Sequence, residues 1–344
     1  MTLDLSKLDN THRLLFSIPL VPLQGKRFQP TGFPGLGAAT FQTKDGQCLL
    51  VESAQSMANR LELTSWDEAN QDIKNELQGL SHVRVLRNKK FLTDTLLESH
   101  RINSPYLLEG SDKKFFDTLK ADLGGLEEGP IDRRKLAEIL LKYDIGSLLH
   151  GVFLAKKDLA GGRLRVARAV SAFIEADGIR VAASGGVKND HVHPGKVEGD
   201  SKNHFGNIPF ARDEFTAERT TLYVNIDLAQ LRGYGLGADV ERLLVLLALY
   251  KLRVMLDGNL RLRTACDLRV DSDTMDTITA NVPDGYKLPS LTELLADLKP
   301  AIDKCRSKMT VTEVTFNDSL KKAKEEEKTA DDDTGNGESE VSED

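Results

Sequence analysis

The sequence predicts an α+β protein, and three features of the chain lead to this prediction. Apolar and polar residues alternate over 14–20 and again over 222–228, as expected for strands with one buried face. The segment 239–255 is apolar nearly all round, which is typical of a buried helix. The resulting order of strand, helix, several strands, helix and strand is compatible with a ferredoxin-like, RRM-like core.

The first half of the chain is predicted to hold a strand, a helix and an insertion. The strand at 14–20 leads into a Gly/Pro-rich segment at 27–41 and then into a helix at 51–63. This helix is predicted to bury four residues at helical spacing, Ala54, Met57, Ala58 and Leu61. Residues 64–145 follow as a helical insertion. Its helices are predicted to start near Ser65, Ser111 and Pro130.

The second half is predicted to be richer in strands, which are expected at 147–155, 163–175 and 179–185. The dipeptide Asp177-Gly178 predicts that the last two form a hairpin. Residues 186–217 are predicted to form a long polar loop, and loops of this length are usually functional or disordered. Alternation over 261–270 predicts another strand, and Ser290 begins a last amphipathic helix.

The negative charge is concentrated at the C-terminal end of the sequence. Of the net charge of −7, residues 321–344 contribute −6 through four lysines and ten acidic residues, so the other 320 residues carry −1. This tail is expected to be disordered because it cannot bury enough apolar surface to offset the entropy of ordering. A nearly neutral body argues against indiscriminate coating of DNA but is compatible with a local basic groove.

Cysteine usage and hydropathy predict a cytoplasmic protein with no membrane partner. The three cysteines are far apart and form no CxxC pair, so neither a disulfide framework nor a zinc site is indicated. Residues 1–10 are unlike a signal peptide. The longest apolar run, 243–250, is too short to span a bilayer.

Several strings of the sequence resemble one known family. They run in order from about residue 12 to about residue 270 and read RFQPTGFPGLGAATF, LLVESAQSMANRLE, SLLHGVFL, GGRLRVARAVSAFIEA and ASGGVKNDHV. These strings are similar to the backbone subunit of the type I-G (formerly I-U) CRISPR surveillance complex, which belongs to the RAMP superfamily. The resemblance implies one RAMP domain over 1–320, with the insertion at 64–145 and a projecting thumb whose loop spans 186–217.

The same resemblance implies a non-catalytic protein that binds CRISPR RNA and polymerises along it with further copies of itself in a helical filament. The implied partners are a CRISPR RNA-processing and capping subunit, a large subunit and target DNA. Base pairing between guide and target would supply sequence specificity, so the protein needs contacts to RNA shape and charge only. No cofactor, metal ion or catalytic residue is expected.

Candidate RNA-binding residues lie in four stretches of the sequence. The helix at 51–63 leaves small polar donors opposite its buried stripe near its positive end, which suits phosphate. Arg163 and Arg165 are predicted to share a strand face, and the glycines before Lys188 allow close approach to phosphate. An ordinary solvated surface is the alternative. The full set is Lys26, Arg27, Gln29, Ser53, Gln55, Ser56, Asn59, Arg60, Arg163, Arg165, Arg168, Lys188, Asn189, His191 and His193.

Two enzymatic interpretations stay open. The segment Asp190-His191-Val192-His193 could belong to a metal-dependent endoribonuclease, because related RAMP subunits of type III complexes cut RNA with a loop aspartate. The segment 233–238 fits the G-x-G-x-x-A fingerprint of a dinucleotide site and has Asp257 about 20 residues further on. Elsewhere, His150 is predicted to be a satisfied core histidine in a strand, and Trp66 to anchor the insertion.

Overall fold

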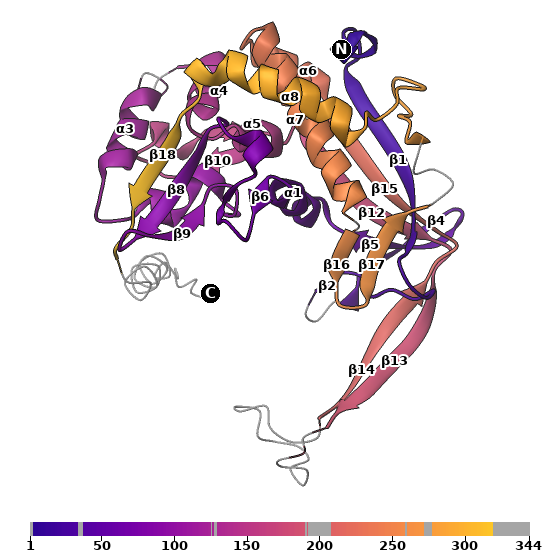
Figure 1. Cartoon of the computed structure of the whole chain (residues 1–344). Helices are drawn as coiled ribbons and strands as arrows, with labels where there is room; N and C mark the ends of the chain where they lie inside the picture. Colours follow the sequence, from indigo (N-terminus) through magenta and orange to yellow (C-terminus); the bar gives the residue numbers. More distant parts are fainter. Residues whose placement is uncertain are drawn as a thin grey trace, which may run out of the picture.

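The computed structural model describes residues 3–33, 37–124, 126, 129–189, 191, 208–258, 260–271 and 277–318. They form an arch (Figure 1). A seven-stranded sheet makes one side, a three-stranded sheet with several helices makes the other, and a two-stranded ribbon projects from the large sheet. The predicted α+β class is therefore confirmed.

The large sheet has the order β16-β17-β1-β15-β12-β5-β4, and all its neighbouring pairs are antiparallel. Its strands are β1 (Arg13–Pro22), β4 (Thr40–Thr43), β5 (Gly46–Glu52), β12 (Val170–Asp177), β15 (Arg219–Asp227), β16 (Leu260–Arg263) and β17 (Cys266–Val270). The predicted strands at 14–20 and 222–228 are confirmed as neighbours, with Phe16 opposite Val224. A short pair, β2 (Gly32–Phe33) and β3 (Gly37–Ala38), lies in the Gly/Pro-rich segment.

Two of the predicted helices lie against one face of this sheet (Figure 1). α1 (Ala54–Leu63) starts three residues later than predicted, because Val51 and Glu52 complete β5 and Ser53 caps the helix. Met57, Ala58 and Leu61 of the predicted stripe are buried, whereas Ala54 is partly exposed. α7 (Ala238–Asp257) is buried nearly all round, as predicted.

The last predicted helix is also confirmed. α8 (Leu291–Cys305) packs against α7 and begins with the predicted capping box of Ser290 and Glu293. The Oε2 atom of Glu293 accepts a hydrogen bond from the backbone nitrogen of Ser290 at 2.8 Å. Such a box satisfies two amide groups that the first helical turn leaves unpaired.

The insertion at 64–145 is mixed, and the prediction of a helical insertion is wrong. It contains β6 (Trp66–Asp67), β7 (Asp72–Ile73), β8 (His82–Arg87), β9 (Lys90–Asp94), α2 (Pro105–Leu108), α3 (Lys114–Leu123) and α4 (Arg133–Tyr143). β18 (Val311–Thr315), from beyond α8, pairs in parallel with β8 and completes a sheet in the order β18-β8-β9. Valines 83 and 85 are buried and alternate with Arg84, a period of two that indicates a strand.

Local predictions inside the insertion had mixed outcomes. No helix begins at Ser65; instead Trp66 lies in β6, is 6% exposed and stacks on Phe91 with ring centroids 5.4 Å apart, consistent with the predicted anchoring role. Ser111 does not cap α3, since the amide of Lys114 donates to Oδ1 of Asp112. A helix does follow Pro130, namely α4.

The predicted strand at 147–155 is helical in its first half. α5 (Gly146–His150) is a short helix, and β10 (Val152–Leu154) begins after Gly151, whose φ is 77°. A Cβ atom on Gly151 would lie 2.8 Å from the carbonyl oxygen of Val166, so this crossing requires glycine. β10 pairs with β11 (Leu164–Val166). Short apolar runs do not distinguish a buried helix from a buried strand by periodicity alone.

The projecting ribbon corrects the hairpin predicted at Asp177-Gly178. β12 pairs with β15 inside the sheet, whereas β13 (Arg180–Lys188) pairs with β14 (Ile208–Thr216) outside it (Figure 1). Gly178, with a φ of 59°, lies in the connection between β12 and β13. Of the predicted loop at 186–217, residues 186–188 and 208–216 are strand. Residues 190 and 192–207, and the tail at 321–344, lie outside the described residues.

Two further features of the core differ from the sequence expectation. The strand predicted at 261–270 is a hairpin of β16 and β17 that turns at Ala265. The glycines of 233–238 connect α6 (Leu228–Gly233) to α7, and β15 before them belongs to an antiparallel sheet. A dinucleotide fingerprint requires a parallel βαβ unit at this point, so that interpretation is wrong. Within the described residues, no helix is long and apolar enough to cross a membrane.

Candidate nucleic-acid interface

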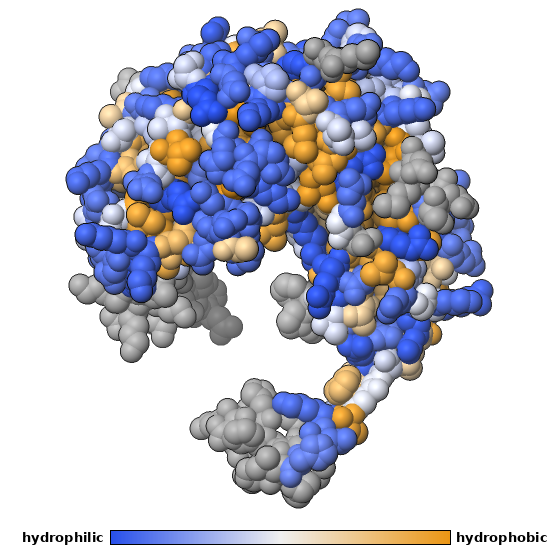
Figure 2. All heavy atoms as spheres, viewed as in Figure 1, coloured by the Kyte–Doolittle hydropathy of each residue, from blue (hydrophilic) through white to orange (hydrophobic). Residues whose placement is uncertain are grey.

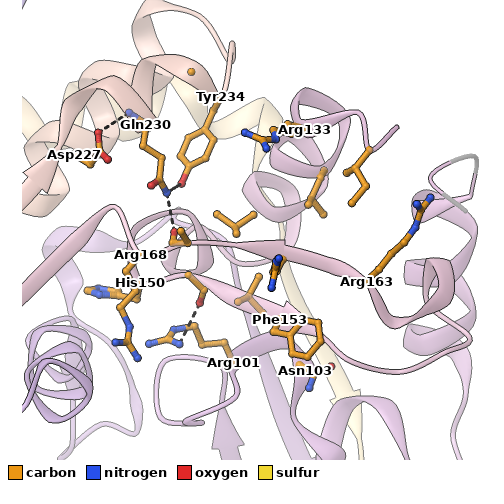
Figure 3. A pocket seen from close by; sticks show the side chains of 18 of the residues that line it. Arg101, Asn103, Arg133, His150, Phe153, Arg163, Arg168, Asp227, Gln230 and Tyr234 are labelled. Carbon is orange, nitrogen blue, oxygen red and sulfur yellow. Dashed lines mark hydrogen bonds between the residues drawn. The ribbon is translucent and has the colours of Figure 1, made fainter. Parts of the chain in front are cut away.

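A groove of about 2090 Å³ lies between the insertion, the β10–β11 pair and α6 (Figure 3). Its lining comes from segments that are far apart in the sequence. Among the described residues that line it, Asp227 is the one acidic side chain, against six arginines. These are Arg13, Arg101, Arg133, Arg163, Arg165 and Arg168.

Four of the predicted RNA-binding residues meet in this groove. Arg163 and Arg165 are exposed, although Arg163 precedes β11 and only Arg165 lies on the strand. Nη2 of Arg163 donates to the carbonyl oxygen of Leu126 at 2.8 Å. Nη2 of Arg168 donates to Oε1 of Gln55. Partial burial, reinforced by the charge of Arg101, lowers the pKa of Arg168 from its usual value.

Two arginines of the groove are neutralised by carboxylates, and three others form no ion pair among the described residues. Arg13 forms an ion pair with Asp227 at 2.6 Å. Arg101 is buried and bonded to both carboxylate oxygens of Glu62, with Nε 2.6 Å from Oε1. Arg133, Arg165 and Arg168 form no ion pair within the described part of the chain. The groove therefore keeps a positive potential, which favours a polyanion.

His150 lines this groove but is not satisfied as predicted. It is 1% exposed and lies in α5, and neither of its ring nitrogens has a hydrogen-bond partner among the described residues. Burial, reinforced by the positive charges of Lys251, Arg101 and Arg168, holds the pKa of His150 well below 6.5. The ring is therefore neutral at pH 7, with one donor and one acceptor unused.

The polar face predicted on the helix at 51–63 is mostly engaged inside the protein. Arg60 pairs with the buried carboxylate of Glu52 at 3.1 Å and donates to the carbonyl oxygens of Arg261, at 3.0 Å, and Leu262. Ser56 donates to the same carboxylate. Glu52 itself ends β5 and is 1% exposed, so it does not lie on the helix face as predicted.

The other members of this face have lesser local roles. Ser53 caps α1 by accepting from the amide of Ser56 at 3.3 Å. Asn59 is half-buried and accepts from Nε2 of Gln55 at 3.4 Å. Of the whole predicted face, only Gln55 lines the groove in the described structure.

The remaining candidates lie near the ribbon. Arg27 pairs with Glu214 at 3.4 Å, and the carbonyl of Gln29 accepts from Arg263 at 3.0 Å, both beside the bridge between Phe28 and Phe215. Lys26 is exposed. Lys188, Asn189 and His191 are exposed at the far end of the ribbon, whereas Asp190 and His193 lie outside the described residues. The predicted set thus divides between the groove, the interior under α1, and the two ends of the ribbon.

Sequence reasoning missed several groove residues. Arg13 adjoins the strand predicted at 14–20 and was given no function, and Arg133 and Asn103 lay in the predicted insertion, also without a function. Phe153, which is 53% exposed beside the groove arginines, lay in the strand predicted at 147–155 and was assigned no function. No local motif marks them, because the groove forms only when these segments meet. Within the described residues, no group of three or more His, Cys, Asp or Glu side chains is placed to hold a metal ion.

The fold and the groove define an α+β protein with a cationic surface of the kind that holds a nucleic-acid backbone. Residues 14–181, just under half of the chain, match the family described as CRISPR-associated protein GSU0053 (Cas_GSU0053). The chain is therefore similar to a CRISPR-associated family over β1, the insertion, the groove segment at 150–168 and β12.

Two solved structures are also similar to this chain. One is a chain of "CRISPR RNA-guided surveillance complex, pre-nicking", with 15% identity, a TM-score of 0.33, and coverage of 70% of this chain and 70% of that chain. The other is Csc2 from Thermofilum pendens, with 10% identity, a TM-score of 0.32, and coverage of 88% of this chain and 81% of that chain. No curated protein matches the sequence.

Proposed function

We propose that this chain is a RAMP-superfamily backbone subunit of a type I-G CRISPR surveillance complex and binds its guide RNA in the arginine-lined groove. The match of residues 14–181 to a CRISPR-associated family supports the CRISPR context. The single observation that carries RNA binding is the uncompensated positive charge of Arg133, Arg165 and Arg168 in one groove.

Guanidinium groups suit this role because they donate to phosphate oxygens in pairs and stay charged at all physiological pH values. Contacts to phosphate position a nucleic acid without reading its sequence. In this proposal base pairing between guide and target DNA provides the specificity, and the subunit performs no chemistry. Copies of the chain bind side by side along one RNA, through a head-to-tail contact that can extend without closing.

The proposal includes partners beyond the RNA and further copies of the chain. A processing and capping subunit would hold one end of the RNA, and a large subunit would contact the assembled filament. The ribbon of β13 and β14 extends away from the core (Figure 1) and could reach a neighbouring copy on the same RNA. In Figure 2 the space between the insertion and the ribbon is open on the side viewed.

The test is RNA binding by the double variant Arg133→Ala, Arg165→Ala. Both side chains are exposed and make no ion pair within the described residues, so the fold should be retained. We expect weaker binding of single-stranded RNA and a log-log salt slope that is less steep by about 0.7 for each phosphate that the variant no longer neutralises. The measurement is a titration at several salt concentrations.

Arg134→Ala is the matched control, because Arg134 adjoins Arg133 on α4 but pairs with Glu138 at 3.0 Å and does not line the groove. It removes one positive charge from the same helix, against two charges in the double variant, and should leave affinity nearly unchanged. Equal losses of affinity from both variants would show a diffuse charge effect and contradict groove binding. RNA recovered after incubation with Mg²⁺ or Mn²⁺ should be full length, and shortening would favour an endoribonuclease.

A further inference from the structure

Phe153 is an aromatic side chain that is exposed to solvent inside the arginine-lined groove. It is 53% exposed, while its neighbours Val152 and Leu154 are 9% and 1% exposed. Of the exposed large hydrophobic residues in the described structure, Phe153 is the one that lines this groove. An exposed phenylalanine costs free energy in water, so its position calls for a physical reason.

The exposure of Phe153 follows from the geometry of the β10–β11 pair. Leu154 and Leu164 face each other across the pair and are both buried, which fixes the inner face. Phe153 and Arg165 are opposite each other on the outer face, and opposed residues of an antiparallel pair have Cβ atoms roughly 5 Å apart. Turning Phe153 inward would expose two buried neighbours, so the ring stays in the groove.

Polar groups around the ring have unused hydrogen-bonding capacity. Asn103 lies beside Phe153 (Figure 3), and its Oδ1 accepts from the backbone nitrogen of Ala155 at 3.2 Å, which orients the side-chain amide. The NH₂ group of Asn103 and the guanidinium of Arg165 have no partner among the described residues. An aromatic face, an amide donor and a cation therefore lie together.

We propose that Phe153 is the stacking platform for one unpaired nucleobase of the RNA in this groove. The amide of Asn103 donates to an acceptor on the edge of that base, and Arg165 contacts the adjacent phosphate. This inference rests on the proposed function and adds to it that the RNA is single-stranded with one base turned out at this point. A base inside a duplex stacks on its neighbours and does not present its face to a side chain.

The test compares Phe153→Leu and Phe153→Trp with the unmodified chain for binding of a single-stranded RNA and of a duplex RNA. Phe153→Leu keeps apolar bulk but removes the aromatic face. Alanine substitution of a stacking aromatic weakens binding by roughly 5- to 150-fold, and we expect Phe153→Leu to fall at the lower end of this range because leucine keeps some apolar contact. The salt slope should be unchanged. We expect duplex binding to be unaffected.

Phe153→Trp should bind at least as tightly, and its fluorescence should fall when RNA is added. The chain's single other tryptophan, Trp66, is 6% exposed, so the unmodified protein supplies the background signal. Arg165→Ala should reduce the salt slope by about 0.7, which distinguishes a phosphate contact from stacking.

The two hypotheses fail in different ways. If the unmodified chain does not bind single-stranded RNA, or binds it without dependence on Arg133 and Arg165, the proposed function is wrong. If binding depends on these arginines but Phe153→Leu binds as tightly as the unmodified chain, or weakens single-strand and duplex binding equally, the stacking platform is wrong and the groove function stands.

Discussion

Several ionisable side chains are buried together beneath the groove. Arg101 connects the carboxylate of Glu62 on α1 to the carbonyl oxygen of Gly151, which precedes β10. Burial raises the pKa of Glu62 to about 7 despite the neighbouring arginine. Removing one member of such a pair leaves an unpaired buried charge, which typically costs about 3–5 kcal/mol. The pair therefore fixes β10 and its groove face relative to α1.

Lys251 is the least compensated cation of this cluster. It is 1% exposed, its Nζ atom lies 3.4 Å from the carbonyl oxygen of Leu61, and burial lowers its pKa to about 8. A folded pKa below the unfolded value means that the unfolded chain binds more protons between about pH 8 and pH 10.5. The contribution of Lys251 to stability is thus most unfavourable below pH 8 and improves as the pH rises through this window.

We expect Lys251→Met to stabilise the protein at pH 7 by about 2 kcal/mol. Relief of the lowered Lys251 pKa contributes about 3 kcal/mol, and the loss of a cation near Glu62 offsets part of this gain. The gain should shrink between pH 8 and 10.5. Chemical denaturation at several pH values measures it. Lys304→Met, at a lysine that is 67% exposed, is the control and should change little. A destabilised Lys251→Met variant would contradict this account of the cluster.

At the residue scale, sequence reasoning located part of the groove and misjudged part of the helix face. Arg163, Arg165 and Arg168 were selected from a local excess of positive charge and do lie in the groove. Arg60 could not be judged from the sequence, since its partners include carbonyl oxygens about 200 positions away, on β16. A helical wheel shows which side chains share a face but not which elements cover it.

At the element scale, the ribbon of β13 and β14 is the feature most separate from the core. Val181, Val187 and Phe210 are 61%, 53% and 50% exposed, so the free ribbon presents apolar side chains to water. Phe215 at its base is 3% exposed and belongs to the core. The outer part of the ribbon therefore contributes little to folding, and its apolar residues would be covered in the proposed filament.

Replacing residues 184–212 by Asn-Gly should remove the outer ribbon and keep its base. Ala183 faces Asp213 in the ladder, and Asn-Gly favours the two-residue turn that such a pair needs. We expect the unfolding temperature to change by less than about 2 °C, because the outer ribbon buries little apolar surface. RNA binding in the groove should persist, while regular multi-subunit particles on guide RNA should not form. Electron microscopy showing normal particles would contradict the role of the ribbon in assembly.

Elements with a clear period were predicted well, and those set by tertiary contacts were not. β1, β15, α7 and α8 follow from alternation, all-round hydrophobicity or a capping box in their own residues. The hairpin predicted at Asp177-Gly178 was wrong because the two strands that this turn connects do not pair with each other. β12 pairs with β15, and β13 pairs with β14. The strand β8 was missed because its six residues lie among segments with helical patterns.

At the scale of the whole molecule, the groove brings together β1, the insertion, β10, β11 and α6, which no single stretch of sequence indicates. The pairing of β18 with β8 was likewise not indicated by any single stretch of sequence, since more than 200 residues separate the two strands. The nearly neutral composition of the body was compatible with a local basic groove, and the structure contains a groove lined by six arginines. The shape of the groove and the presence of Phe153 in it could not be predicted from the sequence and became visible only in the structure.

The central claim is that this groove holds a guide RNA. The most direct measurement is to express the chain together with a CRISPR array, purify it, and sequence the RNA that it retains. The account expects discrete RNAs that share repeat-derived ends around variable spacers, and their loss from the Arg133→Ala, Arg165→Ala variant but not from Arg134→Ala. Recovery of no RNA, or of unselected cellular RNA that the groove variant retains equally well, would contradict it.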